Sequence, residues 1–171
     1  MVKSTNYSAL DIATWFIYKT NAEKKENQAA NDKFEIYEGL THLKLQKLLY
    51  FAQGISLVKN NCPLFFDKIE AWEHGPVVKS VWAKFSSKGR EEITIDDVIS
   101  ENEVIRKIES DFKTREVLNM TYDNFAIYTA WQLRNMTHII NGPWDLTYVP
   151  HKNKEITHDL IKDYFQKEIM E

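Results

Sequence analysis

The sequence predicts a mainly α-helical protein that folds as a single compact domain of about six helices. A chain of 171 residues with 43% hydrophobic residues is long enough to bury one sizeable core. Apolar residues recur at intervals of three and four in most segments, which is typical of amphipathic helices. Two short stretches alternate as strands do, so the pattern also allows a small two-stranded β ribbon.

The first two helices are predicted by their N-caps. Ser8 and Asp11 form a capping pair, and Thr41 is the expected cap of the second helix. The second helix is apolar on most of its sides, so we expect it to be central. Between these helices, residues 19–33 are rich in Lys, Glu, Asn and Gln without an apolar period, which predicts a mobile polar insertion, either a solvated loop or a frayed helix end.

The middle of the chain predicts a short strand and a third helix. Residues 65–72 alternate loosely, as a strand does. Gly75-Pro76 is expected to begin helix three, because proline at the first helical position loses no needed donor. Gly89 is expected to end that helix, and residues 92–95 to pair with the earlier strand as a ribbon.

Three further helices complete the predicted fold. The apolar positions from Val104 to Phe112 suggest an amphipathic helix, and Asp123 is expected to start the next one. Thr157 is the expected cap of the last helix, with Asp159 near the positive end of its dipole.

The net charge and the single cysteine limit which binding partners and which cellular compartment we expect for the protein. The formal net charge is -3 with both signs mixed along the chain, which does not favour nucleic acid or an anionic membrane. The single Cys62 rules out an intramolecular disulfide, and no apolar segment near the start is long enough for export or for crossing a bilayer. We therefore expect a cytoplasmic protein without a membrane partner, for which nucleic acid is not the expected ligand.

The sequence motifs do not predict catalysis. The five histidines include no pair at the three- or four-residue spacing that places two metal ligands on one helical face. Cys62 and the serines lack the turn that exposes a nucleophile, and the few glycines form no phosphate-binding loop. We therefore expect a protein that is not an enzyme, with no cofactor and no metal.

The aromatic residues favour a binding function. Five tryptophans and eight tyrosines exceed what a core of this size requires. Trp72 and Trp144 each border a Gly-Pro turn, where the ring either holds a loop against the core or contacts a partner.

Four stretches of the chain carry a resemblance to a known family. They are residues 7–17 (YxAxxIAxWFI), residues 40–54 (LTxLKLQKLLYFAQG), residues 63–78 (PLF, then IxAWxHGPVV) and residues 137–144 (TH, then GPW). These motifs resemble the Panacea domain of SocA-like antitoxins, also labelled phage-associated GepA-like proteins, in the family's order over nearly the whole chain. We therefore expect one Panacea-like domain over residues 1–171.

The resemblance implies a function. It implies the antitoxin of a two-gene toxin-antitoxin module, frequently prophage-borne, which binds and neutralises a toxin encoded beside it, and it implies no catalytic residues. In the SocA-like case the antitoxin resembles an adaptor that delivers its toxin to a cytoplasmic protease, so a protease is a second expected partner. The chain departs from the family in its long 19–33 stretch and in residues 100–122, which match only loosely.

Six residues near the motifs are the candidate site. They are Lys44, Gln46, Lys47, Trp72, His74 and Trp144. In one interpretation they form a hydrogen-bonded polar centre that holds the helices in register. In the other, part of the group opens onto a groove that receives a toxin segment, with the aromatic rings as anchors.

Two alternative functions come from other classes. One is a phage or prophage regulator that binds nucleic acid directly. The other is a metal-dependent enzyme built on His42, His74 and His138.

Overall fold

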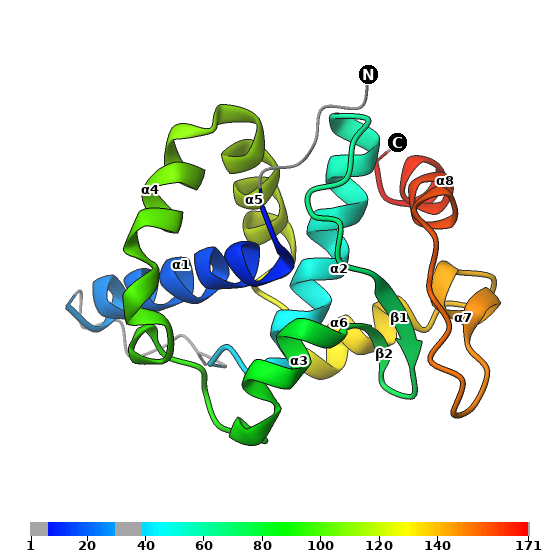
Figure 1. Ribbon diagram of the computed structural model, residues 1–171, viewed down its shortest axis with the longest axis horizontal. Helices are drawn as coiled ribbons and strands as arrows, with labels where there is room; N and C mark the ends of the chain where they lie inside the picture. Colours follow the sequence, from blue (N-terminus) through cyan, green and yellow to red (C-terminus); the bar gives the residue numbers. More distant parts are fainter. Residues whose placement is uncertain (1–6, 30–38, 171) are drawn as a thin grey trace.

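Helix α2 (His42–Lys59) lies at the centre of the structure, a computed structural model that describes residues 7–29 and 39–170 (Figure 1). Thr41 caps this helix as predicted, because its side chain accepts a hydrogen bond of 3.3 Å from the Lys44 backbone N–H. Every residue from Lys44 to Leu57 is buried, so α2 contacts other elements on all of its sides. The predicted central position of this helix is confirmed.

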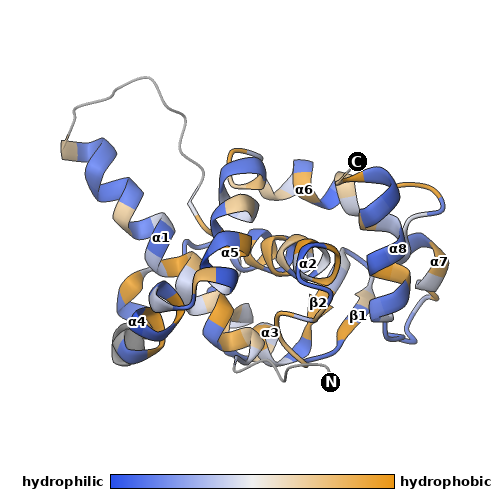
Figure 2. Ribbon diagram, turned by 90° about the horizontal axis from the view of Figure 1, so that it is seen from above, coloured by the Kyte–Doolittle hydropathy of each residue, from blue (hydrophilic) through white to orange (hydrophobic). Residues whose placement is uncertain are grey.

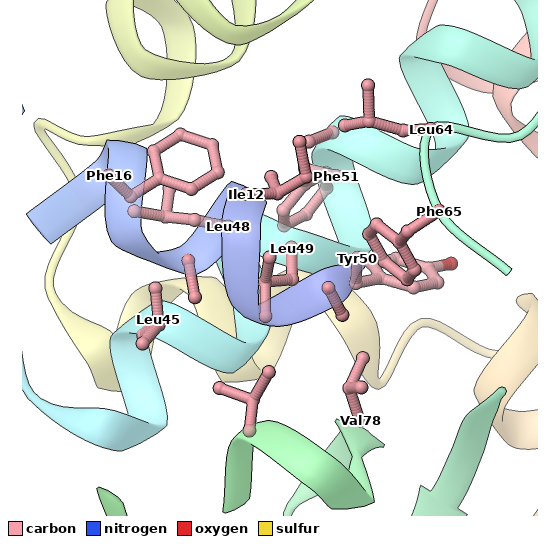
Figure 3. Close-up of a cluster of buried hydrophobic side chains, with 14 of the residues drawn as sticks. Ile12, Phe16, Leu45, Leu48, Leu49, Tyr50, Phe51, Leu64, Phe65 and Val78 are labelled. Atoms are coloured by element: carbon pink, nitrogen blue, oxygen red, sulfur yellow. The ribbon is translucent and has the colours of Figure 1, made fainter. Parts of the chain in front are cut away.

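Helix α1 (Ala9–Ala29) begins at the predicted capping pair. The Ser8 backbone N–H donates to the Asp11 carboxylate at 2.8 Å, and the Asp11 N–H donates to the Ser8 hydroxyl at 3.1 Å. Figure 3 shows Ile12 and Phe16 of α1 in the same apolar cluster as the leucines and aromatic residues of α2. The first half of α1 is therefore held by burial against α2.

The second half of α1 contains most of the stretch that was expected to be a polar insertion. Residues 19–29 continue the helix, and residues 30–33 lie outside the described residues. Ion pairs support these helical turns, with Lys19 3.8 Å from Glu23 and Lys24 2.6 Å from Glu92. The mobility of the stretch stays a prediction.

Strands β1 (Ile69–Trp72) and β2 (Gly75–Val78) form an antiparallel hairpin. The other edge of β1 is covered by the segment before the last helix. There, the Ala71 N–H donates to the Lys154 carbonyl and the Ile156 N–H donates to the Ile69 carbonyl, both at 2.8 Å. The hairpin is therefore paired on the side that would otherwise be an open edge.

Two predictions about this region are wrong. Gly75-Pro76 begins strand β2, and helix α3 (Lys79–Phe85) starts three residues after the expected first helical position, Pro76. Gly75 occupies the turn with a φ of +107°, a conformation that glycine adopts without strain. Residues 92–95 do not pair with β1, because the Ile93 N–H donates to the Leu40 carbonyl at 2.8 Å.

The chain then passes through short helices to the far side of α1. Helix α3 ends at Phe85, before the predicted end at Gly89. Gly89 instead ends the 3-10 turn that follows (Ser86–Lys88), and a second 3-10 segment is η2 (Ile95–Glu101). Next come α4 (Asn102–Ser110) and α5 (Phe112–Phe125).

The boundaries expected for this part are wrong in two places. Phe112 does not continue the apolar face of α4, because Asp111 caps a new helix by accepting a hydrogen bond from the Thr114 N–H at 3.3 Å. Asp123 lies inside α5 and starts no helix. The helix boundaries in this region therefore follow the capping residues and not the spacing of the apolar residues.

The last part of the chain contains α6 (Ala130–Thr137), α7 (Pro143–Thr147) and α8 (His158–Glu168). Thr129 and Gln132 form a capping box for α6, and Thr157 caps α8 as predicted. Pro143 is at the start of α7, so the second Gly-Pro pair does begin a helix. The described residues contain eight α-helices instead of about six, and the mainly α fold with one two-stranded sheet is confirmed.

Figure 2 shows α2 almost end-on, with α5, α6, α8, α3 and the hairpin arranged around it. Helices α1 and α4 pack together beside this group (Figure 1). Within residues 7–29 and 39–170, no helix is both long and apolar enough to span a membrane.

The close packing of α2 on α8 predicts the effect of Gly54→Ala. A Cβ atom at Gly54 would overlap the ring of Phe165, and neither helix can move without disturbing the core. We expect the substitution to lower the free energy of unfolding by about 1–3 kcal/mol, although alanine is the better helix former at an open site. Urea unfolding would measure this, and a stabilised variant would contradict the packing.

Candidate functional site

Gln46 joins α2 to the end of β2 through two hydrogen bonds. Its side-chain NH₂ donates to the Val78 carbonyl at 3.2 Å, and its side-chain oxygen accepts from the Val78 N–H at 2.7 Å. All four groups are buried. Gln46 therefore acts as a neighbouring strand would, because it satisfies both backbone groups of one residue.

Gln53, two turns further along α2, does the same for the segment before β1. Its side-chain oxygen accepts from the Leu64 N–H at 2.8 Å and from the Phe65 N–H at 3.3 Å. Its NH₂ group donates to the Phe65 carbonyl at 2.8 Å and lies 3.2 Å from His158 Nε2. Gln46 and Gln53 lie two turns apart on α2, and together they bind the segment before β1 and the end of β2.

Lys47 reaches the turn of the hairpin from the same helix. Its ammonium group is fully buried and donates to the Pro76 carbonyl at 3.0 Å. Burial, and then the charge of Arg134, lower the pKa of Lys47 to about 7. A Cβ atom at Gly75 would lie 2.8 Å from Lys47 Nζ and 2.9 Å from Thr137 Oγ1, so this glycine also makes room for the two side chains.

Lys44 lies on another side of α2. It is buried and donates a hydrogen bond of 2.8 Å to the Ala126 carbonyl, just after α5. Lys44 therefore holds the end of α5, whereas Gln46 and Lys47 hold the hairpin.

Trp144 ties α7 to the hairpin. Its indole N–H donates to the Trp72 carbonyl at 2.7 Å, and its ring centroid lies 3.8 Å from that of His138 and 4.6 Å from that of Tyr148. Only 9% of Trp144 is exposed. A ring enclosed in this way holds the turn in place and offers little surface to a partner.

Trp72 and His74 lie further out on the hairpin. Trp72 is half-buried, its indole N–H donates to the Glu70 carboxylate at 2.7 Å, and its ring centroid lies 5.3 Å from that of Trp82. His74 is exposed at the turn. The structure thus brings Gln46, Lys47, Trp72 and Trp144 together around the hairpin and places Lys44 and His74 outside that group.

His138, and not His74, is the histidine in contact with the group. Its Nδ1 lies 2.7 Å from the Arg134 carbonyl and its Nε2 lies 3.4 Å from the Glu73 carbonyl, and because a carbonyl oxygen only accepts, each nitrogen hydrogen-bonds to its carbonyl only when it carries a proton. Burial lowers the pKa of His138, against the effect of these two carbonyls, and its ring links α6 to the tip of the hairpin.

Arg134 is the residue near this group that sequence reasoning missed. It precedes His138 by four residues on α6, which places both on one helical face, and that spacing was the available signal. The guanidinium carbon lies 4.6 Å from the centroid of the Trp131 ring, and Arg134 Nε is buried without a hydrogen-bond partner. Only the folded chain brings this charge close to Lys47.

The structure does not bring the three histidines of the proposed metal site together. His42 is half-buried at the start of α2, with a pKa lowered by burial and by the charge of Lys47, whereas His74 is exposed at the hairpin turn. Among the residues that the structure describes, no group of three His, Cys, Asp or Glu side chains could hold a metal ion.

Two cavities lie elsewhere, along α5. One of about 460 Å³ is lined by residues of α5 such as Phe112 and Arg115, and one of about 270 Å³ lies between α5 and the end of α8. None of the six candidate residues lines either cavity. The candidate residues therefore hold the hairpin in place, and neither of these two cavities is part of their site.

Comparisons with known proteins agree with the motifs in the sequence. A family model described as "Antitoxin SocA-like, Panacea domain" matches residues 45–145, more than half of the chain. Antitoxin SocA of Caulobacter vibrioides is 34% identical over 111 residues, which are 63% of this chain and 59% of that protein. The matched part thus spans less than two thirds of the relative's length. No solved structure matches significantly.

The contacts of Gln46 predict that Gln46→Leu is strongly destabilising. Leucine has a similar size but leaves the Val78 N–H and carbonyl without partners in the core. We expect the free energy of unfolding to fall by about 2–4 kcal/mol. The matched control is Gln166→Leu on the exposed face of α8, which should change it by less than about 0.5 kcal/mol. Equal stability of the two variants in urea unfolding would rule out this role for Gln46.

The lowered pKa of Lys47 predicts how stability depends on pH. Between pH 7 and 10.5 the unfolded chain keeps the Lys47 proton and the folded chain has released it, so raising the pH favours folding. One such group contributes a slope of at most about 1.4 kcal/mol per pH unit. The difference in unfolding free energy between wild type and Lys47→Met should therefore vary across this range and level off below pH 7. A difference that is independent of pH would contradict a buried, neutral Lys47.

Proposed function

This chain belongs to the SocA-like antitoxin family defined by the Panacea domain, and on that premise we propose that it is the antitoxin of a two-gene module. In this proposal it binds a toxin encoded beside it and neutralises that toxin. It acts by binding and not by catalysis.

The position of the family match is the observation that carries the proposal. Residues 45–145 run from α2 through the hairpin to the start of α7. They include the contacts of Gln46 and Lys47 with the hairpin and the hydrogen bond of Trp144 to Trp72. The part of the chain that resembles antitoxins is therefore the part that these buried contacts hold together.

The exposure of the candidate residues supports a division of their roles. Three candidate residues are buried and contact the hairpin from the interior of the protein: Gln46, Lys47 and Trp144. Trp72 and His74 keep exposed surface on the hairpin itself. In the proposed function, the enclosed residues make the surface rigid and the hairpin tip is part of what the toxin meets, because a preorganised surface loses less entropy on binding.

Co-expression with each gene that flanks its own tests the proposed function. We expect one neighbouring product to arrest growth when expressed alone, and co-expression of this protein to restore growth and to yield a complex on purification. The control is the same neighbour with an empty vector. If co-expression of this protein restores growth for none of the neighbouring genes, the antitoxin proposal fails. Salt-sensitive retention of DNA by the purified protein would then favour the alternative of a regulator that binds nucleic acid.

The same experiment separates two mechanisms of neutralisation. If the protein blocks its toxin directly, rescue persists in a host that lacks its cytoplasmic proteases. If it delivers the toxin for degradation, rescue is lost in that host and the toxin accumulates. The level of toxin in the two hosts, measured by immunoblot, gives the answer.

A further inference from the structure

Basic side chains from α2 and α6 gather at one place without an acidic partner. Arg134 lies close enough to Lys47 for its charge to lower the pKa of Lys47, and the charges of both residues lower the pKa of His138. No ion pair joins Lys47 or Arg134 to a carboxylate within the ranges that the structure describes. Because the pKa values of Lys47 and His138 are lowered, Arg134 carries the lasting positive charge of this group.

Arg134 is the outermost of these groups. Lys47 is fully buried behind it, whereas Arg134 is half-exposed on α6. Within the described part of the chain, its side chain donates one hydrogen bond, of 3.3 Å from Nη1 to the Asn135 side-chain oxygen, and the buried Nε has no partner. A guanidinium with free donors and an adjacent aromatic ring is suited to bind a carboxylate through two parallel hydrogen bonds.

Exposed apolar residues flank Arg134 at both ends of α6. Trp131 is 60% exposed at its start, and Ile139 and Ile140 are 49% and 81% exposed just beyond its end. Together with Arg134 these three residues are named the α6 surface. In Figure 2, α6 lies on the outside of the molecule, away from α1 and α3. The contact of His138 with Glu73 joins the α6 surface to the tip of the hairpin.

We infer that the α6 surface binds an acidic segment of the toxin, in which a carboxylate pairs with Arg134 and apolar side chains cover Trp131 and Ile140. This inference rests on the proposed function. Charge complementarity favours it, because a carboxylate supplies the charged partner that the half-exposed Arg134 guanidinium lacks among the described residues. Tryptophan and arginine side by side are also the residue types that most often dominate binding energy at protein interfaces. A protein segment fits better than nucleic acid, because the basic group is small and its neighbours are apolar.

Arg134→Gln tests the carboxylate pairing in the complex with the toxin identified by co-expression. The matched control is Arg106→Gln, an exposed arginine on α4. We expect Arg134→Gln to weaken toxin binding by about tenfold or more and to reduce its salt dependence, and the control to leave both unchanged. Arg134→Lys should restore binding only in part, since lysine keeps the charge but not the paired donors.

A second pair of variants tests the apolar part and does not alter any buried residue. Ile140→Asp introduces a charge on the α6 surface, and Phe66→Asp does so at another exposed apolar position, 57% exposed. We expect weaker binding only for Ile140→Asp. If Arg134→Gln and Ile140→Asp both bind the toxin as tightly as wild type, the α6 surface is not the binding site, while the proposed function stands. If wild type itself binds no neighbouring product, both proposals fail.

Discussion

The rest of the structure depends on the way α2 supplies hydrogen-bond partners to backbone that lies inside the core. Leu64, Phe65 and residues 75–78 are buried against α2, where water does not reach their N–H and carbonyl groups. Gln53 and Gln46 satisfy Phe65 and Val78, and Lys47 satisfies the Pro76 carbonyl. A two-stranded hairpin is marginal by itself, so these contacts and the packing around them keep it in one position.

The use of a lysine for one of these contacts has a cost. A buried ammonium without a carboxylate is unfavourable, and the structure responds by lowering the pKa of Lys47 to about 7. Arg134 raises that cost, because it adds a second positive charge and a buried Nε without a partner. In the proposed complex, a carboxylate paired with the Arg134 guanidinium would offset part of the repulsion between Arg134 and Lys47. Lys47, which positions the hairpin from the interior, therefore also lies close to Arg134 of the α6 surface.

The proposed antitoxin function follows naturally from a scaffold of this kind. The family match covers α2, the hairpin and α6, which are the elements joined by the buried polar contacts. These contacts connect main chain to side chain and hold the hairpin against α2. Trp144 has a structural place in this scaffold, whereas Trp72, His74 and the α6 surface remain accessible.

Features that depend only on neighbouring residues could be predicted from the amino-acid sequence. The caps at Ser8, Thr41 and Thr157, the buried character of α2 and the family motifs are all local patterns, because a cap or a helical face involves residues within a few positions. Local patterns also named Gln46, Lys47 and Trp144 as candidates, although they could not say what these residues contact. Only the tertiary structure decided that Gly75-Pro76 forms a hairpin while Gly142-Pro143 begins a helix, since the first pair lies against Lys47 and Thr137. It alone decided that Arg134 approaches Lys47, because the two residues are far apart in the chain and their proximity depends on how α6 packs on α2.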